Sequence, residues 1–548
     1  MAFSRPNTTI PDAIAAGYRS RGLWTDARIG LNITRGAEQW GDWDALVYEG
    51  RRWSYRSLWR WVTAIAHDLV AMGVGPGDRL VWQLSNKVEA LVLHLAAWRI
   101  GALCVPVIPI YREHEMAHIL RDADPTAVAF STERGSRNVA REMDVLLREL
   151  DVNPRCRIAV GEPEDGWHPL TAEPSLSATI DERGLPDPAH HDDPCLLLYT
   201  SGTTAKPKGA LHSSVTLMAE ATTLRSAMGF SYRDVFIMGA PITHIAGLLL
   251  TAIIPPVCGA RSVLLPAWDP DVAVRLADAE HGTFSCGATV FLQAYVERYE
   301  REDTPTHHLQ AFMCGGAAIP PSLIARADAV GIRAFRSWGL TEVPTVGLVG
   351  PDASLELRSQ RDGRVSEGTE VHAIDESGAV LPPGEQGELR VRAPERMLGY
   401  TDPERNAELM SDDGWFRTGD VGVVDADGWI TMTGRIKDIV NRGGEKFSAQ
   451  DIENAIADHP AIASVAVIGA PDERLGETVV AYVTLRPGMT WPGDDALIDH
   501  LETKRLAKQK RPTAWRVIDE LPATLSGKTQ KHVLLALWDR GLADAPSV

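Results

Sequence analysis

Apolar residues recur at helical spacing early in the chain. Leu58, Val62, Ile65 and Leu69 lie three or four positions apart, and Gly73 follows them as a stop signal. A period near 3.6 residues that ends at a glycine predicts a helix with one buried face. We therefore expect this stretch to pack one side of a helix against a core.

Short apolar runs and helical patterns alternate after this helix. A Gly-Pro-Gly-Asp turn leads into residues 79–83, a helix capped by Ser85 or Asn86 is expected to reach Ile100, and residues 103–105 form another short apolar run. Strands that alternate with helices build parallel sheets. The fold class predicted for this part of the chain is therefore α/β.

The pattern changes towards the C-terminus. The pair Asp427-Gly428 separates two apolar runs, and Asp-Gly supplies the positive φ that a tight hairpin turn requires. Beyond this hairpin, residues 445–520 alternate helix-like and strand-like segments, which is typical of a compact α+β unit. We predict a large N-terminal domain of sheet-and-helix subdomains over residues 1–434 and a smaller α+β C-terminal domain over residues 435–548.

Length and composition indicate a globular protein. The 548 residues exceed what one hydrophobic core serves and predict roughly three or four cores. Apolar residues make up 44% and charged residues 23%, as in ordinary soluble proteins. The 55 basic and 73 acidic side chains leave a net charge of −18, which argues against a nucleic-acid partner. A single loop of N–H groups and lysines can still bind a nucleotide in such a chain.

Signals of other protein classes are weak. The start of the sequence lacks the basic and apolar segments of a secretory signal, and the apolar stretches are too short or too charged to span a bilayer, so a cytoplasmic location is expected. His190 and His191 are metal-binding residue types, but their loop offers no further ligand at a useful spacing, which favours a solvated loop. Six singly scattered cysteines are expected to be reduced and mostly buried: Cys104, Cys156, Cys195, Cys258, Cys286 and Cys314.

A loop of small, hydroxyl-bearing and basic residues follows the apolar run at residues 195–199. It reads Thr-Ser-Gly-Thr-Thr-Ala-Lys-Pro-Lys-Gly over residues 200–209. Small residues let the backbone approach phosphate, while hydroxyls and lysines bind it. By composition alone a surface turn fits equally well, because the string lacks the P-loop pattern. Ser-Gly-Lys-Thr at residues 526–529 is no P-loop either, since Pro522 stands where the leading glycine belongs.

Further segments follow this loop in a recognisable order. They are Pro241-Ile242-Thr243-His244, Gly315-Gly316-Ala317, Trp338-Gly339-Leu340-Thr341-Glu342, and residues 414–420, 434–438 and 522–528. With these segments the whole chain resembles the adenylate-forming superfamily of acyl-CoA synthetases, luciferases and nonribosomal-peptide adenylation domains. It is similar in particular to bacterial cyclohexanecarboxylate and short- or medium-chain acyl-CoA ligases.

This resemblance implies a site for ATP and AMP. Asp420 would accept hydrogen bonds from ribose hydroxyls, and Arg435 would contact the ribose. Trp338 replaces a more usual tyrosine and would stack on adenine, although by pattern alone it is a core residue; Ala205 replaces a usual glycine of the phosphate loop. The implied nucleotide-binding residues are Thr200, Ser201, Gly202, Thr203, Thr204, Lys208, Gly315, Gly316, Ala317, Trp338, Gly339, Asp420 and Arg435.

The resemblance also implies catalytic residues. Thr341 and Glu342 would contact the α-phosphate and Mg²⁺, with Glu342 as the metal ligand; hard oxygens suit this ion, whereas by pattern alone the pair is a helix start. Lys528 would promote adenylation, because a cation lowers the barrier most where a carboxylate and a phosphate converge. The Pro-x-x-x-x-Gly-Lys spacing is similar to that of synthetases silenced by lysine acetylation, so an acetyltransferase acting on Lys528 is a further implied partner.

A mobile C-terminal domain is implied for a second half-reaction. In the family this domain rotates about a hinge, here Lys437, and presents a loop to the pantetheine of CoA. That loop corresponds to Arg442, Gly443 and Gly444. Two adjacent glycines suit close passage of a slender ligand, although a bare turn has the same composition. A homodimer is also compatible with the resemblance.

The function implied is that of an ATP-dependent carboxylic acid:CoA ligase that forms AMP, with ATP and CoA as substrates and Mg²⁺ as cofactor. One alternative is an acyl-adenylate ligase that loads a separate carrier protein. The other is a non-catalytic nucleotide or acyl-CoA sensor, against which the joint presence of Glu342, Asp420, Arg435 and Lys528 argues. The implied acid pocket is mostly apolar and favours an uncharged tail, whether alicyclic, aryl or straight-chain. Its residues are His244, Ile245, Gly287, Ala288, Leu340 and Val343.

Overall fold

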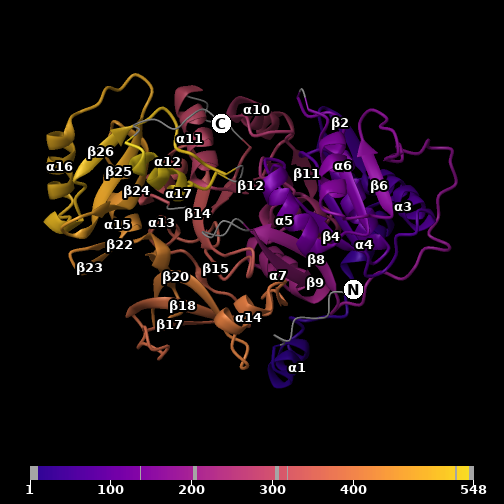
Figure 1. The fold of residues 1–548 in the computed structure, drawn as a ribbon, viewed down its shortest axis with the longest axis horizontal. Helices are drawn as coiled ribbons and strands as arrows, with labels where there is room; N and C mark the ends of the chain where they lie inside the picture. The colour runs from indigo at the N-terminus through magenta and orange to yellow at the C-terminus, as the bar shows by residue number, and fades with distance from the viewer. Residues whose placement is uncertain are drawn as a thin grey trace.

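The structure is a computed structural model that describes residues 10–135, 137–200, 207–302, 308–316, 319–524 and 527–541. Two large sheets with their helices form most of the molecule, a four-stranded sheet lies below them, and a smaller C-terminal part lies at the left in yellow (Figure 1). This arrangement confirms the predicted α/β class with a large N-terminal part and a smaller C-terminal part.

The first large sheet has eight strands, and its centre is parallel. Every residue of β3 is buried, as expected for a strand that helices cover on both faces. In spatial order the strands are β19 (Gly399–Tyr400), β9 (Lys208–Ser213), β8 (Pro194–Thr200), β4 (Leu103–Pro106), β3 (Arg79–Gln83), β5 (Ala127–Ser131), β6 (Cys156–Val160) and β7 (His168–Pro169).

The second large sheet has nine strands and is parallel from β14 to β1. Antiparallel strands close both of its edges. In spatial order they are β16 (Arg364–Val365), β15 (Gly347–Leu348), β14 (Arg333–Trp338), β13 (Ala311–Cys314), β12 (Phe284–Gly287), β10 (Val235–Met238), β11 (Arg261–Leu264), β1 (Asp44–Tyr48) and β2 (Arg51–Ser54).

Helices cover these two sheets, and one apolar core joins them. The predicted helix after residue 54 is α3, whose N-cap Ser54 accepts a hydrogen bond from the Ser57 N–H. Every residue of α4 except Glu89 is buried, in keeping with its apolar sequence. Within the described residues no helix is both long and apolar enough to cross a membrane. The helices are α1 (Asp12–Ser20), η1 (Ile29–Leu31), α2 (Asn32–Trp40), α3 (Tyr55–Ala71), α4 (Val88–Arg99), α5 (Glu113–Ala123), α6 (Val139–Glu149), α7 (Ser214–Met228), α8 (Ile245–Leu248), the π-helical turn η2 (Leu249–Ile253), α9 (Ile254–Cys258), α10 (Pro270–Ala279), α11 (Thr289–Glu302), α12 (Pro321–Ala329), α13 (Leu355–Gln360) and α14 (Pro403–Leu409).

A four-stranded antiparallel sheet follows in sequence and carries the predicted hairpin. Gly428 has a φ of 79°, and the Asp425 carboxylate accepts hydrogen bonds from the N–H groups of Asp427 and Trp429 at 3.1 and 2.9 Å. Asp425 and Gly428 therefore form the tight hairpin turn that the sequence predicts. The strands are β17 (Glu370–Ile374), β18 (Gln386–Arg392), β20 (Phe416–Val424) and β21 (Ile430–Arg435).

The C-terminal part folds around apolar residues between 440 and 537 and so has cores of its own. It begins after β21 with a single 3-10 turn, and its five strands form one sheet. All six cysteines of the chain are free and buried, as predicted. The elements are η3 (Ile436–Asp438), β22 (Ile439–Arg442), β23 (Glu445–Ser448), α15 (Ala449–Ala457), β24 (Ile462–Asp472), β25 (Gly476–Leu485), α16 (Asp494–Thr503), η4 (Lys508–Lys510), β26 (Ala514–Val517) and α17 (Lys531–Asp539).

Candidate active site

A cavity of about 1520 Å³ lies where the nine-stranded sheet, the four-stranded sheet and the C-terminal part meet. Strand β14 ends at this cavity, and ligands of open α/β sheets bind at the carboxyl ends of strands. The cavity brings together residues that are far apart in the sequence. Those used below are Trp268, Thr289, Val290, Phe291, Gly316, Trp338, Gly339, Asp420, Arg435, Lys437, Gly527 and Lys528.

Asp420 has two partners at one side of the cavity. The indole Nε1–H of Trp338 donates to Oδ2 at 2.9 Å, and Arg435 forms an ion pair with Asp420, with Nε 2.8 Å from Oδ1. Asp420 and Arg435 are also cross-strand partners in the β20–β21 ladder, which fixes their backbones opposite each other. Three residues implied by the resemblance are thus joined in one network.

Glu342 is buried in the loop between β14 and β15 and has a tyrosine as partner. The Tyr400 hydroxyl donates to Oε1 at 2.5 Å, and burial beside this carboxylate raises the pKa of Tyr400. The Lys208 ammonium lies 5.9 Å from the centre of the Tyr400 ring, and burial lowers the lysine pKa. Sequence reasoning missed Tyr400, because nothing in its short strand β19 marks it as more than an apolar position.

The Thr341–Glu342 pair forms no helix start; it lies in a run of bends. His212 of β9 holds this loop, since its Nε2–H donates to the Thr341 carbonyl at 2.8 Å while Nδ1 lies 3.1 Å from the Thr216 hydroxyl. Burial lowers the pKa of His212 to about 4, which keeps the imidazole neutral. A lone histidine in a strand carries no sequence signal for this role.

The donor set around Glu342 fits a hard divalent cation. Its Oε2 atom makes no hydrogen bond within the described residues and is therefore available to an ion. The adjacent Thr341 adds a hydroxyl oxygen, and Mg²⁺ prefers carboxylate and other oxygen ligands.

Lys528 reaches the cavity from the C-terminal end of the chain. Burial, together with the charges of Arg435 and Lys437, lowers its pKa to about 7, while Asp420 and Asp438 act in the opposite direction. Its backbone N–H donates to the Thr524 hydroxyl at 3.1 Å. This bond ties the Lys528 backbone to Thr524, and Lys528 lines the same cavity as Asp420.

The neighbouring Gly527 shows how tightly this loop is docked. It has a φ of 81°, and a Cβ atom added there would lie 2.7 Å from Val290 and 2.9 Å from Ala288. On the same side, burial and the Lys528 charge lower the pKa of His244 to about 4. The C-terminal loop thus packs directly on the segment that leads from β12 into α11.

The residues of the implied acid pocket lie behind this docked loop. His244 and Ile245 begin α8, while Gly287 and Ala288 end β12 and precede α11. Leu340 donates its N–H to the Val343 carbonyl at 2.9 Å, and Val343 is buried in the core of the four-stranded sheet. Within the described residues none of these six lines the cavity; the cavity wall at this point consists of Trp268, Thr289, Val290 and Phe291.

Two glycine segments come close to the cavity. Gly315 donates its N–H to the Gly287 carbonyl at 3.1 Å, and Gly316 lines the cavity with a φ of 78°. At Gly339 a Cβ would lie 1.8 Å from the Pro344 carbonyl oxygen, so only glycine allows this turn after Trp338. Thr200 ends β8, and its hydroxyl donates to the Lys208 carbonyl at 3.5 Å.

Other predicted residues lie elsewhere. Ser201, Gly202, Thr203, Thr204 and Ala205 of the phosphate loop, and Ala317, fall outside the described residues. Arg442, Gly443 and Gly444 form the turn between β22 and β23, where both glycines have positive φ and the Arg442 guanidinium donates to the Gln509 carbonyl at 2.6 Å. This turn is not part of the cavity lining.

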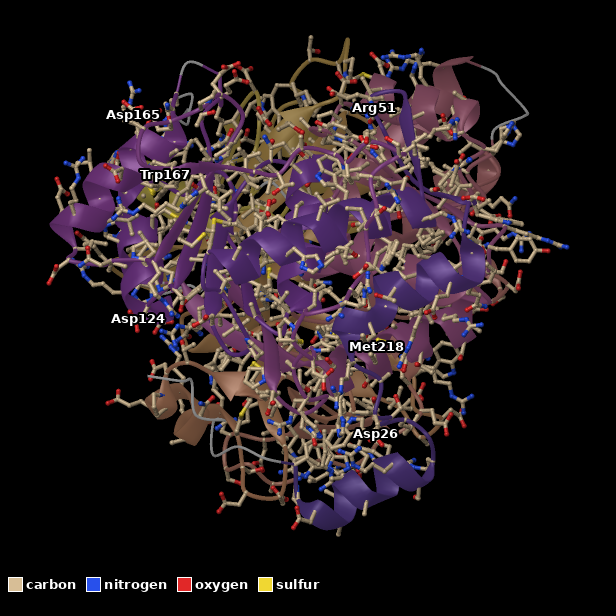
Figure 2. The ribbon with its side chains drawn as sticks, turned by 90° about the vertical axis from the view of Figure 1, so that its right-hand side faces the viewer. Asp26, Arg51, Asp124, Asp165, Trp167 and Met218 are labelled. Atoms are coloured by element: carbon tan, nitrogen blue, oxygen red, sulfur yellow. The ribbon has the colours of Figure 1, made fainter. Side chains whose placement is uncertain are left out.

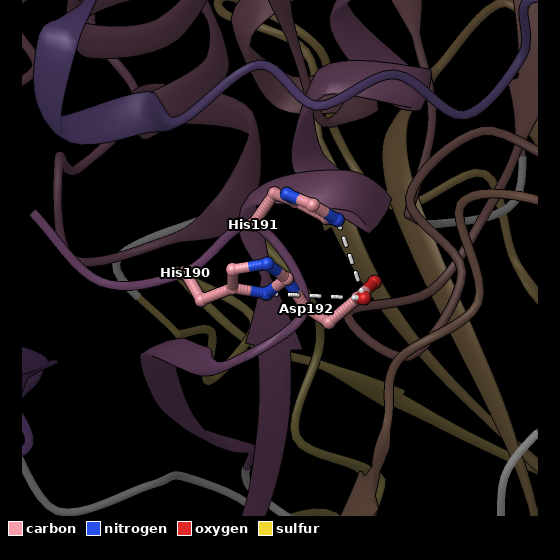
Figure 3. Close-up of side chains that lie close together, drawn as sticks. All are labelled: His190, His191 and Asp192. Atoms are coloured by element: carbon pink, nitrogen blue, oxygen red, sulfur yellow. Dashed lines mark hydrogen bonds and ion pairs between the residues drawn. The ribbon is translucent and has the colours of Figure 1, made fainter.

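His190, His191 and Asp192 are close enough to share an ion (Figure 3). The two rings are tilted by 37° to each other, with centroids 3.8 Å apart. Both Asp192 oxygens also accept hydrogen bonds from Arg19, at 3.1 and 3.2 Å, and His191 Nε2 lies 3.5 Å from Asp26, which Figure 2 labels near α1. The three residues are therefore part of an ion-pair network, and the sequence pattern did not indicate Asp192 as a third neighbour of the histidines.

Comparisons with known proteins identify relatives over almost the whole chain. The sequence model of the AMP-binding enzyme matches residues 33–401, and that of the AMP-binding enzyme C-terminal domain matches residues 451–528. The chain is 33% identical to a medium-chain fatty-acid–CoA ligase of Escherichia coli K12, covering 96% of this chain and 93% of the relative. It is 32% identical to a feruloyl-CoA synthase of an Amycolatopsis species, covering 89% and 94%.

Solved structures agree with this result. The amide bond synthetase McbA from Marinactinospora thermotolerans superimposes with a TM-score of 0.81 at 27% identity, covering 93% of this chain and 99% of that one. ATP-bound MatB from Rhodopseudomonas palustris gives 0.81 at 28% identity, covering 94% and 99%. The likeness includes both the large and the small part of the molecule.

Proposed function

The chain belongs to the AMP-binding enzyme family, and from that membership and the geometry of the cavity we propose that it is an ATP-dependent carboxylic acid:CoA ligase that forms AMP. The observation that carries the proposal is the meeting of Lys528 from the last twenty-odd residues with Asp420, Arg435 and His244 in one place. A non-catalytic sensor would have no use for a partly buried cation at the point where acid and nucleotide converge.

The first half-reaction joins the acid to AMP. A carboxylate oxygen of the acid attacks the α-phosphorus, and the bond to pyrophosphate breaks. Lys528 neutralises the charge that builds up between the two anions, because a cation preplaced in a poorly solvated site stabilises the transition state. Asp420 and Arg435 hold the ribose, and Glu342 with Thr341 holds Mg²⁺, which when bound supplies positive charge to the phosphate oxygens.

The second half-reaction moves the acyl group to CoA. The thiol sulfur attacks the acyl carbonyl, the thiol proton passes to solvent, and AMP leaves with the bonding electrons. We assign the boundary to residues 434–435 and the hinge to Lys437, which lies in the single turn η3 between two independent cores. Rotation there withdraws Lys528 and brings the turn of Arg442, Gly443 and Gly444 to the pantetheine.

The acid is proposed to carry an uncharged tail. Ile245, Ala288 and Leu340 are apolar, and His244 is neutral because burial and Lys528 lower its pKa to about 4. In the cavity itself Trp268 and Phe291 form an apolar wall, with ring centroids 4.2 Å apart. Apolar pockets with few polar groups bind organic tails rather than amino acids.

Two assays test the proposal. Acid-dependent pyrophosphate exchange into ATP, run with straight-chain, alicyclic and aryl acids, measures adenylation; thioester formation with CoA or an isolated carrier protein measures transfer. We expect exchange with at least one acid and consumption of CoA. Exchange without CoA consumption would favour the carrier-loading ligase, and no exchange with any acid would favour the sensor.

Acetylation of Lys528 would switch this enzyme off, since it removes the charge on which adenylation depends. Enzyme acetylated uniformly at Lys528 is expected to lose pyrophosphate exchange and to regain it on deacetylation. Unchanged exchange by the acetylated enzyme would refute this regulation.

A further inference from the structure

Trp338 contacts the nucleotide site through its indole nitrogen. The residue ends β14 immediately before Gly339, and its Nε1–H lies 2.9 Å from Asp420 Oδ2. Both side chains are almost fully removed from solvent, with 6% of Trp338 and 3% of Asp420 exposed. A hydrogen bond from a buried donor to a buried carboxylate is stronger than the same bond in water.

The two partners leave both Asp420 oxygens able to accept further hydrogen bonds. A carboxylate has two oxygens with about two lone-pair sites each. Trp338 takes one site on Oδ2, and the Arg435 Nε lies 2.8 Å from Oδ1 in an ion pair. Two adjacent acceptors are suited to a vicinal diol such as the ribose 2′- and 3′-hydroxyls.

The backbone of Asp420 is already fixed, so its side-chain torsion is what the indole controls. Asp420 donates its N–H to the Thr418 hydroxyl at 3.1 Å and pairs with Arg435 across the β20–β21 ladder. Arg435 is 30% exposed and long, which makes it the less rigid of the two donors. The indole, fixed by packing, determines the plane of the carboxylate.

The ring of Trp338 is itself part of a core. It packs in the cluster that includes Ala210, Val343, Val346 and Ile430 beside the four-stranded sheet. With 6% of its surface exposed, the residue lines the cavity while its indole N–H is directed at Asp420.

We propose that Trp338 is a positioning residue whose indole N–H orients the Asp420 carboxylate for the ribose hydroxyls of ATP. The proposal rests on the proposed function, because it takes the ribose to bind at Asp420. It separates the roles of two neighbours: Asp420 binds the nucleotide, and Trp338 sets the geometry in which it does so.

The test replaces the donor and keeps the aromatic ring. Trp338→Phe is expected to weaken ATP binding about tenfold, the cost of losing one hydrogen bond to a charged group, and to raise the KM for ATP more than it lowers kcat. Calorimetry also compares ATP with 2′,3′-dideoxy-ATP. The wild type should prefer ATP, and Trp338→Phe should lose most of that preference because the dideoxy nucleotide makes no hydrogen bond to Asp420.

Trp167→Phe is the matched control, since Trp167, labelled in Figure 2, is buried in the core of the other large sheet and does not line the cavity. It should leave the ATP to dideoxy-ATP ratio unchanged. Trp338→Leu, whose side chain has no donor, replaces Trp338→Phe as the test if that variant does not fold. An unchanged ratio in a folded Trp338 variant would overturn the positioning role, whereas absence of acid-dependent exchange in the wild type would overturn the proposed function instead.

Discussion

Lys528 is the residue whose charge depends most on its surroundings. Burial and the nearby cations Arg435 and Lys437 lower its pKa to about 7. In the nucleotide-free enzyme the ammonium form therefore predominates only at and below neutral pH. The phosphates of bound ATP oppose this shift, because an opposite charge nearby favours the charged form of a lysine.

Adenylation should consequently lose efficiency as the pH rises. The kcat/KM for ATP in pyrophosphate exchange reports the free enzyme, so it is expected to fall above about pH 7 with the loss of one proton from Lys528. Lys528→Arg should move this decline beyond the accessible range, because guanidinium stays charged. Lys528→Ala should reduce exchange by a factor on the order of 100 to 1000, the effect of removing a preorganised electrostatic group.

The two half-reactions separate this prediction from general damage. Lys528→Ala should still convert supplied acyl-adenylate to thioester, since the proposed rotation withdraws the lysine in that step. Lys508→Ala removes an exposed lysine of the same domain and should change neither rate. Equal loss of both half-reactions in Lys528→Ala would contradict the assigned role.

At the scale of elements, the lysine loop depends on one glycine. Gly527 packs against the segment between β12 and α11, where a side chain would lie 2.7 Å from Val290 and 2.9 Å from Ala288. Contacts closer than about 3 Å force a rearrangement in a close-packed interface. The absence of a side chain at Gly527 therefore determines how closely the loop of the C-terminal domain packs against the N-terminal domain.

Gly527→Ala should leave the C-terminal domain folded but move its loop away from Val290 and Ala288. We expect pyrophosphate exchange to fall roughly tenfold to a hundredfold, since small misplacement of a catalytic group is costly, and thioester formation from acyl-adenylate to remain. Gly488→Ala is the control for backbone strain alone, because Gly488 has a similar φ of 78° and nothing within 4 Å of its added Cβ. Similar losses in both variants would show that strain, not docking, explains the effect.

At the scale of the whole molecule, two buried carboxyls couple helix α7 to the loop that follows β18. Glu220 accepts a hydrogen bond from the Thr345 hydroxyl at 2.6 Å, and Glu395 accepts one from Thr223 at 2.7 Å. Burial, and for Glu220 the neighbouring Glu395, raises their pKa values to about 8 and about 7. The folded protein therefore holds protons here that the unfolded chain releases.

Because the folded protein binds these protons, its stability falls as the pH rises. The stabilising contribution of protonated Glu220 is complete below its ordinary pKa of 4.5 and is lost as the pH rises towards about 8, because the native state binds more protons than the unfolded state across that window. Glu220→Gln removes the titrating group and keeps the acceptor for Thr345. We expect this substitution to change the free energy of unfolding more favourably at pH 8 than at pH 5, by a difference on the order of 2 kcal/mol.

Urea or thermal unfolding at the two pH values measures this difference. Glu149→Gln, an exposed glutamate of α6, is the control and should show no such pH dependence. A Glu220→Gln variant whose effect is the same at pH 5 and pH 8 would show that the carboxyl is already ionised in the folded protein.

Much of this protein follows from its sequence alone. Periodicity and turn residues determined α3, β3, the β20–β21 hairpin and the α+β character of the C-terminal part, because these patterns act over a few residues. The order of the motifs indicated the family. The spacing of His190 and His191 gave no sign of the ion pairs that Asp192 forms with Arg19 and His191.

Only the tertiary structure decided which of these residues meet. Tyr400 on Glu342, His212 on Thr341, Trp338 on Asp420 and Gly527 on Ala288 join positions 58 to 239 residues apart. No local pattern encodes such contacts, since they arise when separate sheets and domains pack and their side chains fill the space between them. The sequence by itself determined the elements and the chemical groups; packing across domains decided their partners, their protonation and the depth at which the lysine loop is seated.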